Sequence, residues 1–458
     1  MLLKNSKQFL PILLFIFLGV ESIYYFNSIG IMDDPKIIYQ IVYDFKLNLN
    51  IGDLLSTFFN YINNEVSRGG FQILLFPQWL IQGIPYLLLK VQGYYLFNLL
   101  IVYLSIYIFL KGVNLFYEIN LGSCFALFFC WPYFYDSIVH PSLQQKIIFL
   151  FIGLLLLELK RTKPRFFLVI IYSFLIPFIK LQGVVLFMIV FTIYIYRRSE
   201  VFLYSLVSTS LANVIILYVY LNNEGSYFSR GFNFEIFQGN FIGIPLALTV
   251  FGISCIIFHK LLNLHIPIYL GLALGLILLC LLISVSRSSF SYISISYVYL
   301  FVPLIYISYN ELSAILREKF SFDLSKLFHI SVILLFATVH YLFALPRYER
   351  WHGLGETIET ISTLNEDKVI YHTCLEAPQR FNQILANEYK VSPKPIEPLG
   401  DGYEKLNKEI AGGNFLLVVD PYDCDQTKKE KIKESCKVVK DYSKDYRYDE
   451  VKLIEYQC

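Results

Sequence analysis

Two adjacent carboxylates stand just after the first long apolar run of the sequence. The stretch SIGIMDDPKIIYQ, residues 28–40, contains Asp33 and Asp34, followed by Pro35. Such carboxylates can supply a general base or bind a divalent metal, and both alternatives stay open. A structural role is a third alternative, because Asp favours the N-cap of a helix and Pro favours its first turn. One acid can cap a helix while the other does chemistry.

Further ionisable residues lie in short polar segments between later apolar runs, including FYDSIVHPSLQQK and PFIKLQG. The candidates are Arg68, Asp136, His140, Lys180, Arg230 and Arg287. Cations suit a phosphate-bearing ligand, because Arg offers a bidentate fork and Lys a point charge. A lipid phosphate that carries a sugar would use both sets. A carboxylate would deprotonate or orient an acceptor hydroxyl, and the cations would stabilise the leaving phosphate.

Each of these residues also has a purely structural alternative. Lys180 can extend its amine from an apolar segment to the membrane surface. Asp136 and His140 can be ordinary loop residues, and SRGGF, which contains Arg68, can be a plain turn. The choice depends on whether the elements that carry these residues bring them together.

The composition indicates which elements those are. The chain has 458 residues, of which 56% are hydrophobic and 16% charged, and its mean hydropathy is +0.54. A soluble domain is nearer to a quarter charged. Repeated apolar runs, several of them long enough to cross a bilayer, therefore predict an α-helical polytopic membrane protein.

We expect about eleven transmembrane helices. The apolar runs cover residues 8–26, 94–110, 117–135, 143–158, 166–179, 182–196, 202–221, 239–258, 264–285, 291–309 and 326–346. Residues 71–89 are also apolar, but Pro77, Gly83 and Pro85 interrupt them, which predicts an interfacial or re-entrant segment.

Basic residues at the ends of the runs predict the topology. With eleven spans, all six basic clusters fall on one side: Lys4/Lys7, Lys111, residues 160–165, Arg197/Arg198, His259/Lys260 and residues 317–319. By the positive-inside rule this side is cytoplasmic. The N-terminus is then cytoplasmic, and all the candidate site residues lie on the outer face of the plasma membrane. A cleaved signal peptide is the alternative for the first run, but FLGVESIYYF lacks a small-x-small cleavage site.

The charge also divides the chain into two domains. From Arg347 to Cys458 there are 17 Lys/Arg and 21 Asp/Glu residues, which is 38 charged residues in 112. The preceding 346 residues carry 36. We therefore expect a transmembrane domain over residues 1–346, with a first outer loop over 27–93. An extracytoplasmic α/β domain is expected over 347–458. Strand-like runs cover 368–373, 414–420 and 450–457, and helix-like runs cover 377–389 and 425–439.

The eight cysteines divide in the same way. Cys124, Cys130, Cys255 and Cys280 lie in apolar runs and read as small packing residues. The other four are Cys374, Cys424, Cys436 and Cys458. In an extracytoplasmic domain they predict disulfides, with three possible pairings. One of these would join Cys424 to Cys436 across the second helix-like run.

The whole pattern resembles the GT-C superfamily of membrane glycosyltransferases. It is similar to protein O-mannosyltransferases, lipid A aminoarabinose transferases and O-antigen-modifying glucosyltransferases. MDDP matches the family's acidic motif in the first outer loop, and FPQWLIQGIPYLLLKVQG resembles its interfacial helix. YDSIVHPS occupies the place of the second outer-loop acid, and IPFIKLQGVVLF resembles the Lys-Gly segment between the fifth and sixth spans.

This resemblance implies an inverting transfer from a polyprenyl-phosphate-linked sugar to a lipid, glycan or protein acceptor. Asp33 or Asp34 would be the base, Asp136 the second acid, and Lys180 the contact to the lipid phosphate. No nucleic acid partner is expected. Two alternatives remain: a polysaccharide ligase or polymerase, and a lipid-linked glycan transporter without covalent chemistry. The sequence shows no inverted repeat, which weighs against a transporter.

Overall fold

The structure is a computed structural model of the whole chain. It describes residues 2–25, 56, 59–60, 75–131, 143–179, 181–222, 243–285, 290–320, 325–364, 369–372, 382, 384–386, 396–399, 403–419, 426–445 and 452–458. The chain forms two compact units. Unit 1 comprises Met1–Phe17, Asn50–Gln78 and Asn98–His340, and unit 2 comprises Leu18–Leu49, Trp79–Phe97 and Tyr341–Cys458.

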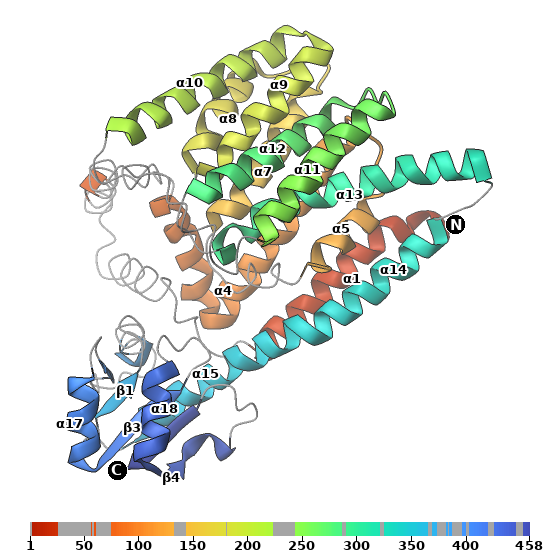
Figure 1. Cartoon of the computed structure of the whole chain (residues 1–458). Coiled ribbons are helices and arrows are strands. Elements are labelled where there is room, and N and C mark those ends of the chain that lie inside the picture. The colour runs from red at the N-terminus through yellow and green to blue at the C-terminus, as the bar shows by residue number, and fades with distance from the viewer. Residues whose placement is uncertain are drawn as a thin grey trace. The chain divides into compact units, whose positions relative to one another are not determined.

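Helices make up the membrane-type part of the chain (Figure 1). They are α1 (Leu2–Tyr25), α4 (Leu75–Asn114), α5 (Leu121–Phe129), α7 (Leu143–Leu159), α8 (Phe166–Ile179), α9 (Val185–Arg197), α10 (Glu200–Asn222), α11 (Gly243–Leu261), α12 (Pro267–Val285), α13 (Phe290–Phe320) and α14 (Ser325–Val339). The five-residue π-helical segment η4 (His340–Ala344) follows α14. Each of the eleven predicted apolar runs thus overlaps one of these helices.

The number of spans stays a prediction. Three described helical segments are long and apolar enough to cross a membrane: Leu88–Asn114, Glu200–Tyr218 and Ser296–Lys319. Other apolar helices in the described ranges are shorter, and α5 has only nine residues. The runs on either side of position 180 are separate helices, as predicted, because the 3-10 turn η2 (Leu181–Val184) lies between α8 and α9.

The predicted interruption at residues 71–89 is displaced in the structure. The helix α4 runs from Leu75 through Pro85 and breaks at Lys90, whose backbone has φ 58° and ψ −142°. A positive φ is rare for a residue with a side chain, so the break marks a real change of helix direction. A proline breaks only one hydrogen bond of the helix ladder, and a membrane helix can tolerate that loss. Whether residues 75–89 lie at a membrane surface remains a prediction.

Aromatic side chains fill the core of unit 1 around Tyr299 on α13. Its ring stacks on Phe149 of α7 at 4.2 Å between centroids, and it contacts Phe109 of α4 and Phe128 of α5 edge-on. The four cysteines of the apolar runs are buried thiols, as predicted. Further packed pairs within unit 1 are α12 with α9, α10 with α8, α11 with α12, and α7 with α8.

Unit 2 contains a five-stranded mixed sheet in the order β2-β1-β3-β5-β4. The strands are β1 (Ile370–His372), β2 (Ile396–Pro398), β3 (Asn414–Val419), β4 (Lys437–Asp441) and β5 (Lys452–Gln457). Strand β1 pairs in parallel with β2 and β3, whereas β5 pairs antiparallel with β3 and β4. The helices α15 (Leu345–Thr363), α17 (Glu404–Gly412) and α18 (Gln426–Ser435) complete the described part. The three strand-like runs of the sequence correspond to β1, β3 and β5.

The second helix-like run of this region was predicted too long. Helix α18 ends at Ser435, and residues 437–441 form β4 beside β5. The β-branched Val438 and Val439 favour a strand, and pairing with β5 supplies backbone partners that a longer helix would have provided locally. The described residues of the first run, 382 and 384–386, are helical as expected. Strand β2 was not predicted, because Pro393 and Pro395 precede it, Pro398 ends it, and proline disfavours a strand.

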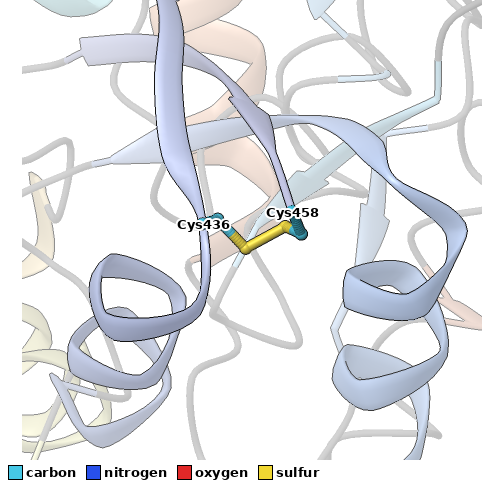
Figure 2. Close-up of a disulfide and its surroundings, with 2 residues drawn as sticks. All are labelled: Cys436 and Cys458. Carbon is cyan, nitrogen blue, oxygen red and sulfur yellow. A yellow bond between two sulfur atoms is a disulfide. The ribbon is translucent and has the colours of Figure 1, made fainter.

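A disulfide joins Cys436 to Cys458 (Figure 2). Cys436 lies between α18 and β4, and Cys458 follows β5, so the bond ties the ends of two paired strands. The amide of Cys458 also donates to the carbonyl of Gly413 at 2.7 Å, beside β3. The alternative bridge from Cys424 to Cys436 is therefore wrong, because Cys436 already has this partner.

Candidate functional site

All eight predicted site residues fall outside the described residues. These are Asp33, Asp34, Arg68, Asp136, His140, Lys180, Arg230 and Arg287. The site can therefore be built only from the described helix ends that flank these positions. The structure neither places the eight residues together nor separates them.

The eight positions lie in every second connection between the helices. They lie in the connections α1–α4, α5–α7, α8–η2, α10–α11 and α12–α13. The alternate connections, α4–α5, α7–α8, α9–α10 and α11–α12, are described, and each of them adjoins one of the predicted cytoplasmic basic clusters. In a bundle of antiparallel neighbours, alternate connections lie on one side. The prediction that the eight residues share one face depends on this alternation.

The end of α1 is anchored shortly before the acidic pair. The carbonyl of Tyr25, the last residue of α1, accepts a hydrogen bond from Nδ1 of His352 on α15 at 3.2 Å. The Tyr25 ring lies 5.6 Å from the ring of Tyr348, also on α15 and fully buried. These contacts lie within unit 2. They hold the C-terminal end of α1, eight residues before Asp33, against α15.

A buried cation marks the end of the second polar segment. Lys146 lies in the first turn of α7, directly after FYDSIVHPSLQQ, and its exposed fraction is 0%. A buried ammonium in a membrane protein is costly unless its charge is compensated, so such residues mark functional sites by default. The sequence grouped Lys146 with the outer-face polar residues but did not single it out. The signal was its position at the head of an otherwise apolar run, IIFLFIGLLLLEL.

Two hydroxyl groups form a hydrogen-bonded chain that ends at the backbone carbonyl of this lysine. Ser105 on α4 donates a hydrogen bond to the carbonyl of Lys146 at 2.5 Å. Tyr299 on α13 donates to the Ser105 oxygen at 2.7 Å, and all three residues are fully buried. A hydrogen-bonded chain thus links three helices at the position of Lys146. Because a buried polar group must find partners, this chain fixes the helix ends in register.

Close packing of α4 on α7 begins two turns further along both helices. A Cβ at Gly153 of α7 would come within 2.7 Å of the backbone of Ile108 on α4. A Cβ at Gly112 of α4 would meet the carbonyl of Gly153 at 3.0 Å. Small residues allow membrane helices to approach this closely. The glycine contact and the Ser105 bond together set how α7 presents Lys146.

The turn around position 180 is equally constrained. Gly183 in η2 is buried, and a Cβ there would lie 2.3 Å from the carbonyl oxygen of Ile176. Pro177 lies in the last turn of α8, and its Cα would be 2.8 Å from the same Cβ. Only glycine fits this turn. The glycine of IPFIKLQG therefore holds η2 against the end of α8, on the C-terminal side of Lys180.

Metal binding is not indicated by the described residues. Among them, no three His, Cys, Asp or Glu side chains gather in a way that could hold a metal ion. The carboxylates expected to bind a divalent metal, Asp33, Asp34 and Asp136, lie outside this part of the chain.

Comparison with known proteins gives one kind of match. No protein-family model matches the sequence, and no curated protein matches it. Two crystal structures of ArnT from Cupriavidus metallidurans are similar in structure. The one bound to undecaprenyl phosphate has 12% identity and a TM-score of 0.40, covering 82% of this chain and 87% of that chain. The apo structure has 11% identity and a TM-score of 0.41, covering 82% and 86%.

Proposed function

We propose that the chain is a membrane glycosyltransferase that takes a sugar from a polyprenyl-phosphate-linked donor. The observation that carries this proposal is Lys146, a fully buried cation at the start of α7. It follows directly on the segment that contains Asp136 and His140. A buried cation at the start of an apolar helix suits an anionic phosphate presented from a lipid, and we propose that Asp136 lies close to it. One acid of the pair Asp33 and Asp34 supplies the general base of the proposed reaction.

In the proposed reaction, the acceptor hydroxyl oxygen attacks the anomeric carbon of the donor sugar. The bond between that carbon and the phosphate oxygen breaks, and the polyprenyl phosphate leaves with the electron pair. Asp33 or Asp34 takes the hydroxyl proton, and Lys146 and Lys180 stabilise the charge that builds on the phosphate. A single displacement of this kind inverts the anomeric centre. Arg68, Arg230, Arg287 and His140 are proposed to position the donor and acceptor.

The proposal also fixes where the reaction takes place. The chain would lie in the plasma membrane with its N-terminus in the cytoplasm and the sheet of unit 2 outside. Because the connections that carry the candidate residues alternate with the basic ones, this orientation exposes the site at the outer face. The acceptor would be a lipid, glycan or protein of that face.

A transfer assay in isolated membranes tests the proposal. Membranes that contain the protein would receive a radiolabelled polyprenyl-phosphate sugar, and labelled product would be measured with Asp33→Asn and Asp34→Asn separately. Loss of a general base lowers the rate about 10²–10⁴-fold, so one of the two variants should lose nearly all transfer. Glu118→Gln, an exposed acid between α4 and α5, is the matched control and should keep full activity.

Two further outcomes would contradict parts of the proposal. Full transfer by both aspartate variants would remove the catalytic role of the pair. Movement of labelled lipid across the membrane without a labelled product would instead indicate a transporter. Treatment with EDTA separates the two roles of the carboxylates, because a metal-dependent transfer would stop and then resume when Mg²⁺ or Mn²⁺ is added.

A further inference from the structure

Two cations lie close to one aromatic ring in the connections that adjoin the basic clusters. These connections alternate along the chain with those that carry the candidate site residues. The amine of Lys160, just after α7, lies 5.3 Å from the centroid of Phe116. The guanidinium of Arg197, at the end of α9, lies 5.1 Å from the same centroid. Phe116 itself follows α4 and packs edge-on against Phe202 of α10. Three connections of unit 1 therefore meet at this ring.

Attraction to the ring does not remove the repulsion between the two cations. A cation near an aromatic face is attracted by the negative charge of that face, but two like charges on one ring oppose each other. Burial lowers the pKa of the Lys160 amine, and the neighbouring charge of Arg197 lowers it further. Within the described residues, neither Lys160 nor Arg197 forms an ion pair with a carboxylate. This pair of charges therefore calls for an anion.

The buried carboxylate of Glu158, two residues before Lys160 in the chain, is already committed to other cations. Glu158, near the end of α7, accepts hydrogen bonds from Arg165 through Nε at 3.1 Å and Nη2 at 2.9 Å. It also forms an ion pair with Arg161 at 3.1 Å. Because Glu158 is nearly buried and bound by two arginines, it cannot also neutralise Lys160 and Arg197. The anion must come from outside this cluster.

Exposed aromatic rings lie on α8 and α10, the helices that follow Lys160 and Arg197 in the chain. Phe166 and Phe167 begin α8 and are 44% and 72% exposed, and Tyr204 on α10 is 46% exposed. The Phe166 and Tyr204 rings lie 5.6 Å apart. Helix ends that carry exposed aromatic rings together with lysine and arginine are typical of the level at which lipid headgroups meet acyl chains. These exposed rings thus favour an anion that carries an acyl chain over a free ion.

We propose that Lys160 and Arg197 bind the phosphate of an anionic membrane lipid, with Phe116 beneath it and the exposed aromatic rings against its acyl chains. The lipid belongs to the leaflet on this side, which the charge distribution predicts to be the cytoplasmic one. This site is separate from the proposed donor site, since it uses the alternate connections. It does not depend on whether the chain transfers sugars.

Lipid retention tests the site directly. The full chain would be purified from mixed phosphatidylglycerol and phosphatidylcholine, and bound lipids would be counted by native mass spectrometry during delipidation. The double variant Lys160→Gln/Arg197→Gln should bind phosphatidylglycerol about 25-fold more weakly, because each cation contributes roughly fivefold. The control Lys260→Gln/Lys319→Gln removes two exposed cations from other predicted cytoplasmic helix ends and should leave binding unchanged.

The other variants and a competition experiment each test one part of the lipid-site proposal. Phe116→Leu keeps both charges and should reduce affinity by less than the double variant does. The single variants Lys160→Gln and Arg197→Gln provide the same test if the double variant does not fold. Competition by inorganic phosphate as effective as that by the lipid would overturn the lipid assignment. Equal loss in the control pair would show only general attraction of a basic surface and would overturn the site.

Discussion

The Ser105 hydroxyl on α4 donates a hydrogen bond of 2.5 Å to the carbonyl of Lys146 on α7. Through the Tyr299 hydroxyl, which donates to Ser105 at 2.7 Å, the backbone of a buried lysine is tied to two other helices. The bond is to the backbone, so it fixes the main chain at Lys146 without using the ammonium group. This arrangement is what a membrane protein needs if it must present a charge at one fixed depth.

Removing the Tyr299 hydroxyl should disturb this presentation. In Tyr299→Phe the ring packing on Phe149 remains, but Ser105 loses its donor. We expect the KM for the lipid-linked donor to rise severalfold and the thermal midpoint in detergent to fall by an amount corresponding to about 1 kcal/mol. Tyr269→Phe is the matched control, because it removes another tyrosine–serine hydrogen bond, to Ser308 at 2.7 Å. It should cost similar stability with an unchanged KM.

The glycine contact between α4 and α7 should tolerate no added methyl group. A Cβ at Gly153 would lie 2.7 Å from the Ile108 backbone, so Gly153→Ala must push the helices apart. Overpacking of this kind typically costs 1–3 kcal/mol. The contrasting variant is Gly275→Ala in α12, where the nearest atom lies at 3.6 Å. A thermal denaturation series in detergent should show a lower midpoint for the first variant alone; equal midpoints would contradict the close approach.

Lys180 should act on the donor rather than on the fold. The 3-10 turn next to it is set by Gly183, which is wedged against Ile176, so Lys180→Ala should leave the thermal midpoint unchanged. If its amine contacts the lipid phosphate, the KM for the donor rises at least tenfold, and Lys180→Arg recovers part of the affinity. Gly183→Ala should lower both stability and activity. Unchanged donor affinity in Lys180→Ala would leave the lysine a surface-anchoring role.

The disulfide leaves one pairing for the other two cysteines of the C-terminal region. If all four pair, Cys436–Cys458 implies a second bond between Cys374 and Cys424. Peptide mapping under non-reducing conditions should recover both bonds. Closing a loop of this length in the unfolded chain corresponds to about 3 kcal/mol, so Cys436→Ser/Cys458→Ser should unfold unit 2 at a clearly lower temperature. A crossed pairing in the map would contradict the structure at Cys436.

The sequence by itself determined the helices of the membrane-type part. Apolar runs of sufficient length specify helices wherever the chain enters lipid, because every backbone polar group there must be satisfied locally. Runs rich in β-branched and aromatic residues likewise located β1, β3 and β5. The sequence also grouped Lys146 with the outer-face polar residues, since position along the chain alone assigns a residue to a connection.

Only the tertiary structure decided which residues are partners. The burial of Lys146 and its bond to Ser105 depend on α4 and α7 approaching at Gly112 and Gly153, positions 41 residues apart in the chain. Val438 and Val439 lie in a strand, because β5 offers hydrogen bonds that the local sequence cannot reveal. Cys436 pairs with Cys458 for the same reason. Local composition fixes how much of a helix or strand each segment can form, whereas contacts between distant segments fix where a charge or a thiol points.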